Sequence, residues 1–341
     1  MEPYISVIIT AFNRQNFVKE AVESVLEQNL EREEYEIIVV NNFNDPVFDE
    51  FCKTKNISSL GYSENGIGQM MVLGIEAAKG EVICFLDDDD TFNEEKLLYV
   101  KHLFISHPQL IYYHNDGIYT DLHLNPIKSL NMQNTKQAES IFLEEDEKDY
   151  SLKNFLQHVH RFGTSCISVR KSPFDQYLEG IKLIRVSPDI FITTCAMLAS
   201  GAVYSDNRKL TNYRVWKSQW SSYRTDRTPD GIKTIHSRAL DSAYGYEVLL
   251  RFTLVSPHIH VKRYIESVFL ARTVSCSILN PNPSRKEILA AWKRFVAKIS
   301  LADTVNLLME SATIFSVLST IAYEIAPTLS RTVFIRLTPT V

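Results

Sequence analysis

The chain has 341 residues, more than one compact core usually holds, so we expect two lobes or one enlarged α/β domain. A hydrophobic content of 45% and a charged content of 23% exclude a wholly disordered or fibrous protein. The net charge of −5 conceals a division, because residues 1–150 sum to −17 and residues 151–341 to +12. This asymmetry predicts either a basic surface for an anionic partner or two unlike surfaces whose charges compensate.

Short apolar runs alternate with helical patterns through the first hundred residues. The expected elements are, in chain order, strand 5–10, helix 16–28, strand 36–40, a weaker helix and strand ending near residue 60, helix 68–79, strand 81–86 and helix 93–107. We expect Gly80 to end the helix before it in a left-handed conformation. This alternation predicts an α/β fold, with a mostly parallel sheet flanked by helices on both faces.

The remaining chain is less regular. Residues 120–150 are polar and are interpreted as an insertion or a mobile loop. The later expected elements are a helix near 151–160, strand 164–169, helix 189–199, a strand ending near 213, and helical segments 231–254, 258–272, 284–300 and 303–325. The C-terminal third is therefore predicted to be helical.

The five cysteines and the histidine pairs give no sign of a structural metal. No Cys-x-x-Cys pair occurs, so we expect buried free thiols in a reducing compartment. The pairs His158-x-His160 and His258-x-His260 lack the cysteine or HExxH context of a zinc site. The N-terminus enters a strand without a basic n-region, which predicts a cytoplasmic protein with no secretory signal.

Four consecutive aspartates, Asp87 to Asp90, follow the buried strand 81–86. In open α/β sheets this end of a strand is where ligands bind. Clustered carboxylates repel one another, and Mg²⁺ or Mn²⁺ would offset that repulsion while completing its shell with phosphates. The run therefore indicates a metal–diphosphate site. A solvated acidic helix start explains Asp89 and Asp90 but not Asp87, which ends a buried strand.

The turn after the first strand reads Thr10-Ala11-Phe12-Asn13-Arg14 and contains no glycine. A Rossmann dehydrogenase would need G-x-G-x-x-G there. A sugar-1-phosphate nucleotidyltransferase would also need a glycine-rich loop, and no P-loop occurs anywhere. These classes are excluded.

Several segments, in this order and spacing, resemble family 2 glycosyltransferases of the GT-A fold: Ile5–Arg14, Ser24–Gln28, Asn65–Gly68 and Ala78–Asp90. The resemblance covers roughly the first 110 residues. It implies a GT-A, Rossmann-like sheet and the transfer of a sugar from a nucleotide diphosphate donor with inversion. It also implies a transferase domain over residues 1–225, with a nucleotide-sugar half at 1–115 and an acceptor half at 116–225.

The resemblance assigns the donor site residue by residue. The residues implied to bind the nucleotide sugar are Thr10, Ala11, Asn13, Arg14, Asn41, Asn42, Asn65, Gly66, Asp87 and Asp88. Asp89 is implied to bind the metal, and Asp87 to lie toward the ribose. The metal would neutralise charge on the leaving nucleoside diphosphate.

Asp189 is the candidate general base. It follows Ser187-Pro188 about a hundred residues after the aspartates, where the family has a carboxylate at a helix start. The alternative is an ordinary helix N-terminal residue. The acceptor-side residues implied by the resemblance are Gly163, Thr164, Ser165, Arg214 and Trp216.

Two positions depart from the family pattern. Asn41 and Asn42 replace a pair of aspartates, and a neutral amide matches the N–H and carbonyl of uracil, which favours a UDP-sugar. Trp216 replaces a metal-binding histidine, so Asp89 and the diphosphate hold the metal alone or another residue substitutes. Trp216 and Trp220 would stack on a sugar or pack internally. These departures leave open a non-catalytic nucleotide-sugar-binding protein.

Residues 226–341 are predicted to form a basic helical region. Residues 204–298 carry a net charge of +10, with paired basic residues beside Tyr264, Trp292 and Phe295. The uncharged run 311–323 is too short to span a bilayer. We expect peripheral binding to an anionic cytosolic membrane face, with a lipid-linked acceptor, or a homodimer that modifies a soluble glycan. No nucleic-acid-binding motif occurs, and nucleic acid is not expected as a partner.

Overall fold

The computed structural model describes residues 2–63, 66–128, 130, 140–159, 162–215, 229–280, 282 and 284–298. The chain divides into two compact units, one within residues 1–215 and the other within residues 216–341. Several predictions lie outside the described residues: Asn65, His160, Trp216, Trp220, the boundary at 225 and 226, and the helical segment 303–325 with its uncharged run.

A single mixed sheet forms the centre of the first unit. Its strands are β1 Ile5–Ala11, β2 Tyr35–Asn41, β3 Ser58–Gly61, β4 Val82–Asp87, β5 Thr91–Phe92, β6 Leu110–Thr120, β7 Ile141–Leu143, β8 Ile167–Arg170 and β9 Ala202–Arg214. Their order is β3-β2-β1-β4-β8-β6-β9-β5, and β7 also pairs with β9. Strands β1 to β4 are mutually parallel, as are β6 and β9, whereas β8 runs antiparallel between β4 and β6.

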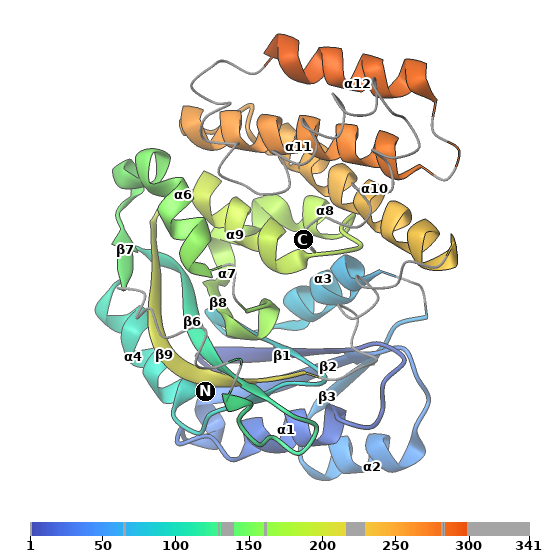
Figure 1. Cartoon of the computed structure of the whole chain (residues 1–341). Helices are drawn as coiled ribbons and strands as arrows, with labels where there is room; N and C mark the ends of the chain where they lie inside the picture. Colours follow the sequence, from blue (N-terminus) through green and yellow to red (C-terminus); the bar gives the residue numbers. More distant parts are fainter. Residues whose placement is uncertain are drawn as a thin grey trace. The chain divides into compact units, whose positions relative to one another are not determined.

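Helices cover both faces of this sheet (Figure 1). They are α1 Val18–Leu26, α2 Pro46–Thr54, α3 Ile67–Ala77, α4 Lys96–Ser106, α6 Lys148–Val159, α7 Lys171–Phe174, α8 Leu178–Ile181 and α9 Pro188–Leu198. Apolar residues of α1, α2 and α4 form one core with β1 and β2, while α3 packs on the opposite face. The predicted α/β class is confirmed.

Strand β1 shows why the N-terminal strands have nearly continuous apolar sequences. Ile5, Val7 and Ile9 belong to the core shared with α1, α2 and α4. Ile8 points to the other face, where it packs so closely on α3 that a Cβ at Gly74 would lie 2.5 Å from its Cγ2. Since side chains alternate between faces, a strand covered on both sides must be apolar at every position.

The expectation that Gly80 ends a helix in a left-handed conformation is wrong. Helix α3 ends at Ala77, and the following Ala78 is extended, with φ −66° and ψ 133°. Gly80 is not among the residues with positive φ, whereas Gly201 has a φ of 114°. Glycine is needed at position 80 because a Cβ there would lie 2.5 Å from the backbone nitrogen of Ser6.

Two parts of the sheet differ from the sequence interpretation. Residues 110–120, for which no strand is predicted, form the central strand β6, whose pairing with β9 shifts register beside Asp116. Polar His114, Asn115 and Asp116 interrupt the apolar pattern there, so the sequence period is lost. Residues 141–147, interpreted as loop, form β7 and a 3₁₀ turn.

The second unit is helical in its described part. Helices α10 Pro229–Phe252, α11 Ile259–Leu279 and α12 Arg285–Lys298 pack in sequence, and α11 and α12 share a buried apolar cluster that includes Phe295. Trp292 packs partly buried against that cluster. No helix in the described residues combines the length and apolarity that a bilayer span requires. The predicted helical character is therefore observed up to residue 298.

Candidate active site

The turns that follow β1 and β2 are joined by two asparagines. The backbone N–H of Asn13 donates to Asn42 Oδ1 at 2.7 Å, and Asn42 Nδ2 donates to Asn13 Oδ1 at 2.9 Å. Asn13 has a left-handed φ of 55°, which asparagine tolerates better than most residues. Parallel pairing places Ala11 beside Asn41, so both turns leave the same edge of the sheet. Two predicted donor-site residues thus hold each other in place.

Arg14, the next residue of that turn, reaches the aspartate run. Its Nε donates to Asp88 Oδ2 at 3.1 Å and its Nη2 donates to Asp88 Oδ1. Its Nη1 donates to Asp89 Oδ2 at 2.7 Å. Register explains the approach, because Thr10 of β1 lies opposite Asp87 of β4. One guanidinium therefore neutralises two carboxylates that the fold buries.

Asp90 faces the interior and is held by the fold. The hydroxyl of Ser165 donates to Asp90 Oδ2 at 2.6 Å, and the backbone N–H of Arg214 donates to Asp90 Oδ1 at 2.9 Å. The same hydroxyl accepts the N–H of Asp87 at 3.0 Å. The acidic helix start proposed as an alternative for Asp90 does not describe this carboxylate, which is buried and paired at both oxygens.

Burial makes the charged form of this run costly. Burial is the main cause that raises the pKa of Asp87 to about 7, followed by the charge of Asp89, while Arg14 opposes the rise. Burial likewise raises the pKa of Asp88 to about 8 despite Arg14. The pKa of Asp90 also lies well above its ordinary value, again chiefly because of burial. An additional positive charge beside the run would therefore stabilise its ionised carboxylates.

The donor chemistry of the run fits a hard divalent cation. Mg²⁺ characteristically uses one or two protein carboxylates and takes phosphate and water oxygens for the rest. Asp87 and Asp89 offer that number of carboxylates. The described residues hold no group of three or more acidic, histidine or cysteine side chains around one cation position. The residues thus fit a cation that shares its shell with a ligand, and do not form a complete protein cage.

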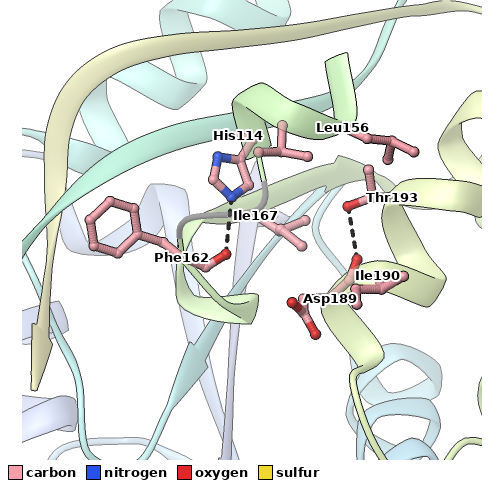
Figure 2. A pocket seen from close by; sticks show the side chains of 8 residues that line it. His114, Leu156, Phe162, Ile167, Asp189, Ile190 and Thr193 are labelled. Carbon is pink, nitrogen blue, oxygen red and sulfur yellow. Dashed lines mark hydrogen bonds between the residues drawn. The ribbon is translucent and has the colours of Figure 1, made fainter. Parts of the chain in front are cut away.

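Asp189 lies at the start of α9, where the chain turns sharply. Ser187 precedes the helix with a left-handed φ of 51°, and Pro188 occupies its first turn. Figure 2 shows the hydroxyl of Thr193 donating to the Asp189 main-chain oxygen, at 2.8 Å. A largely apolar pocket adjoins this turn. The residues that line it are His114, Leu156, Val159, Phe162, Ile167, Asp189, Ile190 and Thr193.

Tyr213 lies near the aspartate run, since a Cβ at Gly163 would lie 3.8 Å from both Tyr213 Cε2 and Asp87 Oδ2. No sequence pattern predicts a role for it. Its pKa is raised first by burial and then by the charges of Asp90, Asp87, Asp89 and Asp189. The charge of Asp189 also contributes to raising the pKa of Asp87. Carboxylates about a hundred residues apart in sequence therefore influence the pKa of the same tyrosine.

A buried lysine binds the turn at Ser165, which anchors the aspartate run. No sequence pattern predicts it as a site residue. Lys96 begins α4, and its Nζ donates to Ser165 O at 2.6 Å and Thr211 Oγ1 at 3.1 Å. Burial lowers the pKa of Lys96 to about 8, while nearby thiols and Asp90 oppose that shift. A helical pattern alone marks such a lysine as a surface residue, so the sequence gives no signal for it.

The remaining predicted residues divide between the turns and the interior. Gly163 adjoins the run, since a Cβ there would lie 3.8 Å from Asp87 Oδ2. Arg214 is fully buried, donates to Glu20 Oε2 at 2.7 Å and lies 4.2 Å from the ring of Phe17. Its acceptor role stays a prediction. Of four other predicted residues, Thr10 and Thr164 are buried and Gly66 immediately precedes α3. Asn41 Nδ2 donates to Ser59 Oγ at 3.1 Å.

Two solved structures with a similar fold are glycosyltransferases in complex with nucleotide sugars. The glycosyltransferase TarS from Staphylococcus aureus, residues 1–349 in complex with UDP-GlcNAc, gives a TM-score of 0.51 at 14% identity, covering 87% of this chain and 89% of that one. Mannosyltransferase PcManGT from Pyrobaculum calidifontis, in complex with GDP-Man and Mn²⁺, gives 0.52 at 11% identity, covering 94% and 88%. The fold is therefore that of GT-A glycosyltransferases.

Sequence comparison then gives the family. Residues 6–178, just over half of the chain, match glycosyl transferase family 2, and the chain belongs to that family. An uncharacterized glycosyltransferase of Rickettsia bellii is 38% identical over 97 residues, which are 27% of this chain and 14% of that protein. The chain thus matches a small part of the length of this curated relative.

Proposed function

We propose that this protein transfers a sugar from a nucleotide diphosphate sugar to an acceptor hydroxyl or phosphate, with inversion at the anomeric carbon. The observation that carries the proposal is the short chain of contacts between Asp189 and the aspartate run. Phe162 lines the pocket beside Asp189, and its ring centroid lies 5.8 Å from that of Tyr213. A Cβ at Gly163 would lie 3.8 Å from both Tyr213 Cε2 and Asp87 Oδ2. An inverting transfer needs a donor site and one general base within reach of each other. Family membership and the hydrogen-bonded turns at Asn13 and Asn42 support the proposed donor site.

Asp189 is the proposed general base. Its carboxylate takes the proton of the acceptor hydroxyl while the acceptor oxygen forms a bond to the anomeric carbon. The bond from that carbon to the diphosphate oxygen breaks on the opposite side, and the nucleoside diphosphate leaves with the electron pair. The Ser187-Pro188 turn and the Thr193 hydrogen bond fix the backbone of the first turn of α9, which carries this carboxylate.

Asp87 and Asp89 would hold Mg²⁺ or Mn²⁺, with Asp87 also toward the ribose. When bound, the cation supplies a Lewis acid that offsets the charge growing on the leaving diphosphate. Arg14 is a second group that can bind phosphate, because its planar fork matches phosphate oxygens as well as carboxylates. Asp90 contributes indirectly, by anchoring the run to the turn at Ser165.

A uridine donor is the proposed choice among nucleotides. Asn41 and Asn42 are neutral amides with both a donor and an acceptor, which suit the N–H and carbonyl of uracil. The paired donors of guanine would be better matched by a carboxylate. Thermal-shift titration with UDP- and GDP-sugars in the presence of Mn²⁺ compares the bases directly. A larger shift with GDP-sugars would overturn the uridine assignment.

The central experiment compares Asp189→Asn with Asp89→Asn. Asp189→Asn should lower turnover 10²–10⁴-fold, the usual contribution of a general base, while donor affinity stays near the wild-type value. Asp89→Asn should lose both turnover and metal-dependent donor affinity. The alternative of a non-catalytic nucleotide-sugar-binding protein gains support if wild type binds a donor with Mn²⁺ but neither transfers nor hydrolyses its sugar.

An anionic membrane, on its cytosolic face, is the proposed location of the acceptor. The turn between α10 and α11 exposes Leu254 by 79% and Val255 by 84%. Arg251, Lys262 and Arg263 are exposed on the adjoining helical turns. Apolar side chains between basic residues fit a phospholipid surface better than water. The aromatic residues Trp292 and Phe295 are instead used in packing α12, and add nothing to such a surface.

Flotation with anionic and neutral liposomes tests the membrane proposal. The double variant Leu254→Asp/Val255→Asp should reduce binding to anionic liposomes at least tenfold. Val47→Asp is a matched control, because Val47 is 81% exposed on α2 in the other unit. Equal flotation of both variants overturns the assignment to this turn. A wild-type dimer that ignores liposomes would favour the soluble, glycan-modifying homodimer instead.

A further inference from the structure

The position of Arg14 has a consequence for how the site binds its ligands. Its guanidinium contacts both oxygens of Asp88 and one oxygen of Asp89. The side chains of Asp88 and Asp89 are 0% and 6% exposed, whereas that of Arg14 is 29% exposed. Arg14 therefore enters the run from its more exposed side and occupies Asp89 Oδ2, an oxygen that a cation on Asp89 could otherwise use.

The backbone keeps Arg14 at this place. Asn13, immediately before it, is fixed by its two hydrogen bonds to Asn42 and by its left-handed conformation. Thr10, four residues earlier, is paired in register with Asp87. The position of the guanidinium beside the aspartates is thus fixed by strand register and by the turn after β1.

A divalent cation and Arg14 compete for Asp89. Two positive charges a few ångströms apart repel, and the repulsion is strong where the surroundings are buried. A diphosphate changes this balance, because it brings negative oxygens that the guanidinium can bind in the same forked geometry. Arg14 would then lose a carboxylate and gain a phosphate.

We propose that Arg14 is an internal counter-ion that exchanges Asp89 for the donor diphosphate, so that the metal and the nucleotide diphosphate bind cooperatively. In the site without ligand, Arg14 neutralises Asp88 and Asp89 and weakens the binding of a cation alone. With the diphosphate present, Arg14 moves to its oxygens and leaves Asp89 to the cation. This inference rests on the proposed donor site, but it concerns binding and not turnover.

The test measures Mn²⁺ binding to the full chain at pH 8, by electron paramagnetic resonance of unbound Mn²⁺, without and with saturating UDP. Wild type should bind Mn²⁺ weakly alone and at least tenfold more tightly with UDP. Arg14→Gln should bind Mn²⁺ alone several-fold more tightly than wild type, and UDP should then enhance Mn²⁺ binding much less. Arg14→Lys keeps the charge without the fork and should fall between them.

Arg32→Gln is the matched control. Arg32 donates to Tyr35 O at the opposite end of β2. The substitution Arg32→Gln therefore removes one positive charge without altering a contact of the aspartate run. Arg32→Gln should behave as wild type in both titrations. Circular dichroism and melting temperature establish that each variant is folded, and Arg14→Lys provides the test if Arg14→Gln is not.

The proposal is overturned if Arg14→Gln binds Mn²⁺ alone no more tightly than wild type, or if UDP enhances Mn²⁺ binding equally in both. Failure of the proposed function looks different. If no nucleotide diphosphate binds to wild type, the donor site is refuted, and the Mn²⁺-only titration still shows whether Arg14 competes with a cation at Asp89. A lower affinity in Arg14→Gln would mean that Arg14 assists the cation, contrary to the proposal.

Discussion

Ser165 donates a hydrogen bond of 2.6 Å to the carboxylate of Asp90, a residue 75 positions earlier in the chain. Its hydroxyl also accepts the N–H of Asp87, so one side chain holds both ends of the aspartate run. Asp88 and Asp89 are held instead by Arg14. Within the run, Ser165 therefore holds the Asp90 carboxylate and the Asp87 backbone, whereas Arg14 holds the carboxylates of Asp88 and Asp89.

Replacing the anchor should destabilise the fold. Ser165→Ala leaves Asp90 Oδ2 and the N–H of Asp87 without a buried partner, and we expect the free energy of unfolding to fall by about 1–3 kcal/mol. Urea denaturation measures it. Ser172→Ala is the control, because Ser172 is exposed on α7 and should change stability by less than about 0.5 kcal/mol. Equal effects of the two substitutions would show that the anchor contributes nothing.

Gly68 is required by close packing at the start of α3. A Cβ there would lie 1.9 Å from the backbone oxygen of Ile181, and the Gly68 N–H donates to Ile184 O at 3.0 Å. Gly68→Ala should therefore lower the free energy of unfolding by about 3 kcal/mol, since backbone atoms cannot easily yield. Gly61→Ala, where no atom lies within 4 Å of a Cβ, should be neutral or slightly stabilising. A tolerated Gly68→Ala would contradict this packing.

Lys148 should make the free energy of unfolding depend on pH. Its Nζ donates to Ala196 O and Ala199 O at the end of α9, and burial lowers its pKa to about 7, with Glu145 opposing the shift. The unfolded chain, with a lysine pKa of about 10.4, binds more protons than the folded chain between about pH 7 and 10. Stability from this group therefore rises with pH through that window, by up to about 1.4 kcal/mol per unit.

Comparison with Lys148→Met isolates this effect. The stability of wild type minus that of the variant should be larger at pH 9 than at pH 7, as measured by urea denaturation at both values. Below pH 7 the lysine is charged in both states, and the difference should become constant. A difference that is constant or shrinks from pH 7 to pH 9 would refute the lowered pKa.

The link between Asn13 and Asn42 should matter for the donor. Asn42→Ala removes both hydrogen bonds to Asn13, so the left-handed turn that carries Arg14 is no longer preorganised. We expect UDP affinity, measured by calorimetry with Mn²⁺, to fall about tenfold. Asn29→Ala, on the exposed turn after α1, should leave UDP affinity unchanged. Unchanged affinity in Asn42→Ala would separate this turn from donor binding.

Strands β1, β2 and β4 could be predicted because each is buried along nearly its whole length and is followed by a recognisable turn or helix. The donor-side residues follow from this, since parallel strands bring Asn13, Asn42 and Asp87 to one edge. Strand β3 is largely exposed and gives a weaker pattern. Strand β6 could not be predicted, because His114, Asn115 and Asp116 break its period and only neighbouring strands supply its pairing. Lys96 and Tyr213 could not be predicted, because no local pattern marks a buried lysine or a tyrosine near the aspartate run.

The sequence by itself determined the α/β class, the family resemblance and the position of the carboxylates, because apolar period and turn chemistry are local properties. Only the tertiary structure decided what each carboxylate contacts. Antiparallel β8 lies between β4 and β6, and Ser165, in the turn before it, lies beside Asp90. The backbone N–H of Arg214 reaches Asp90 across 124 residues. Such contacts depend on strand order and register, which local sequence does not encode.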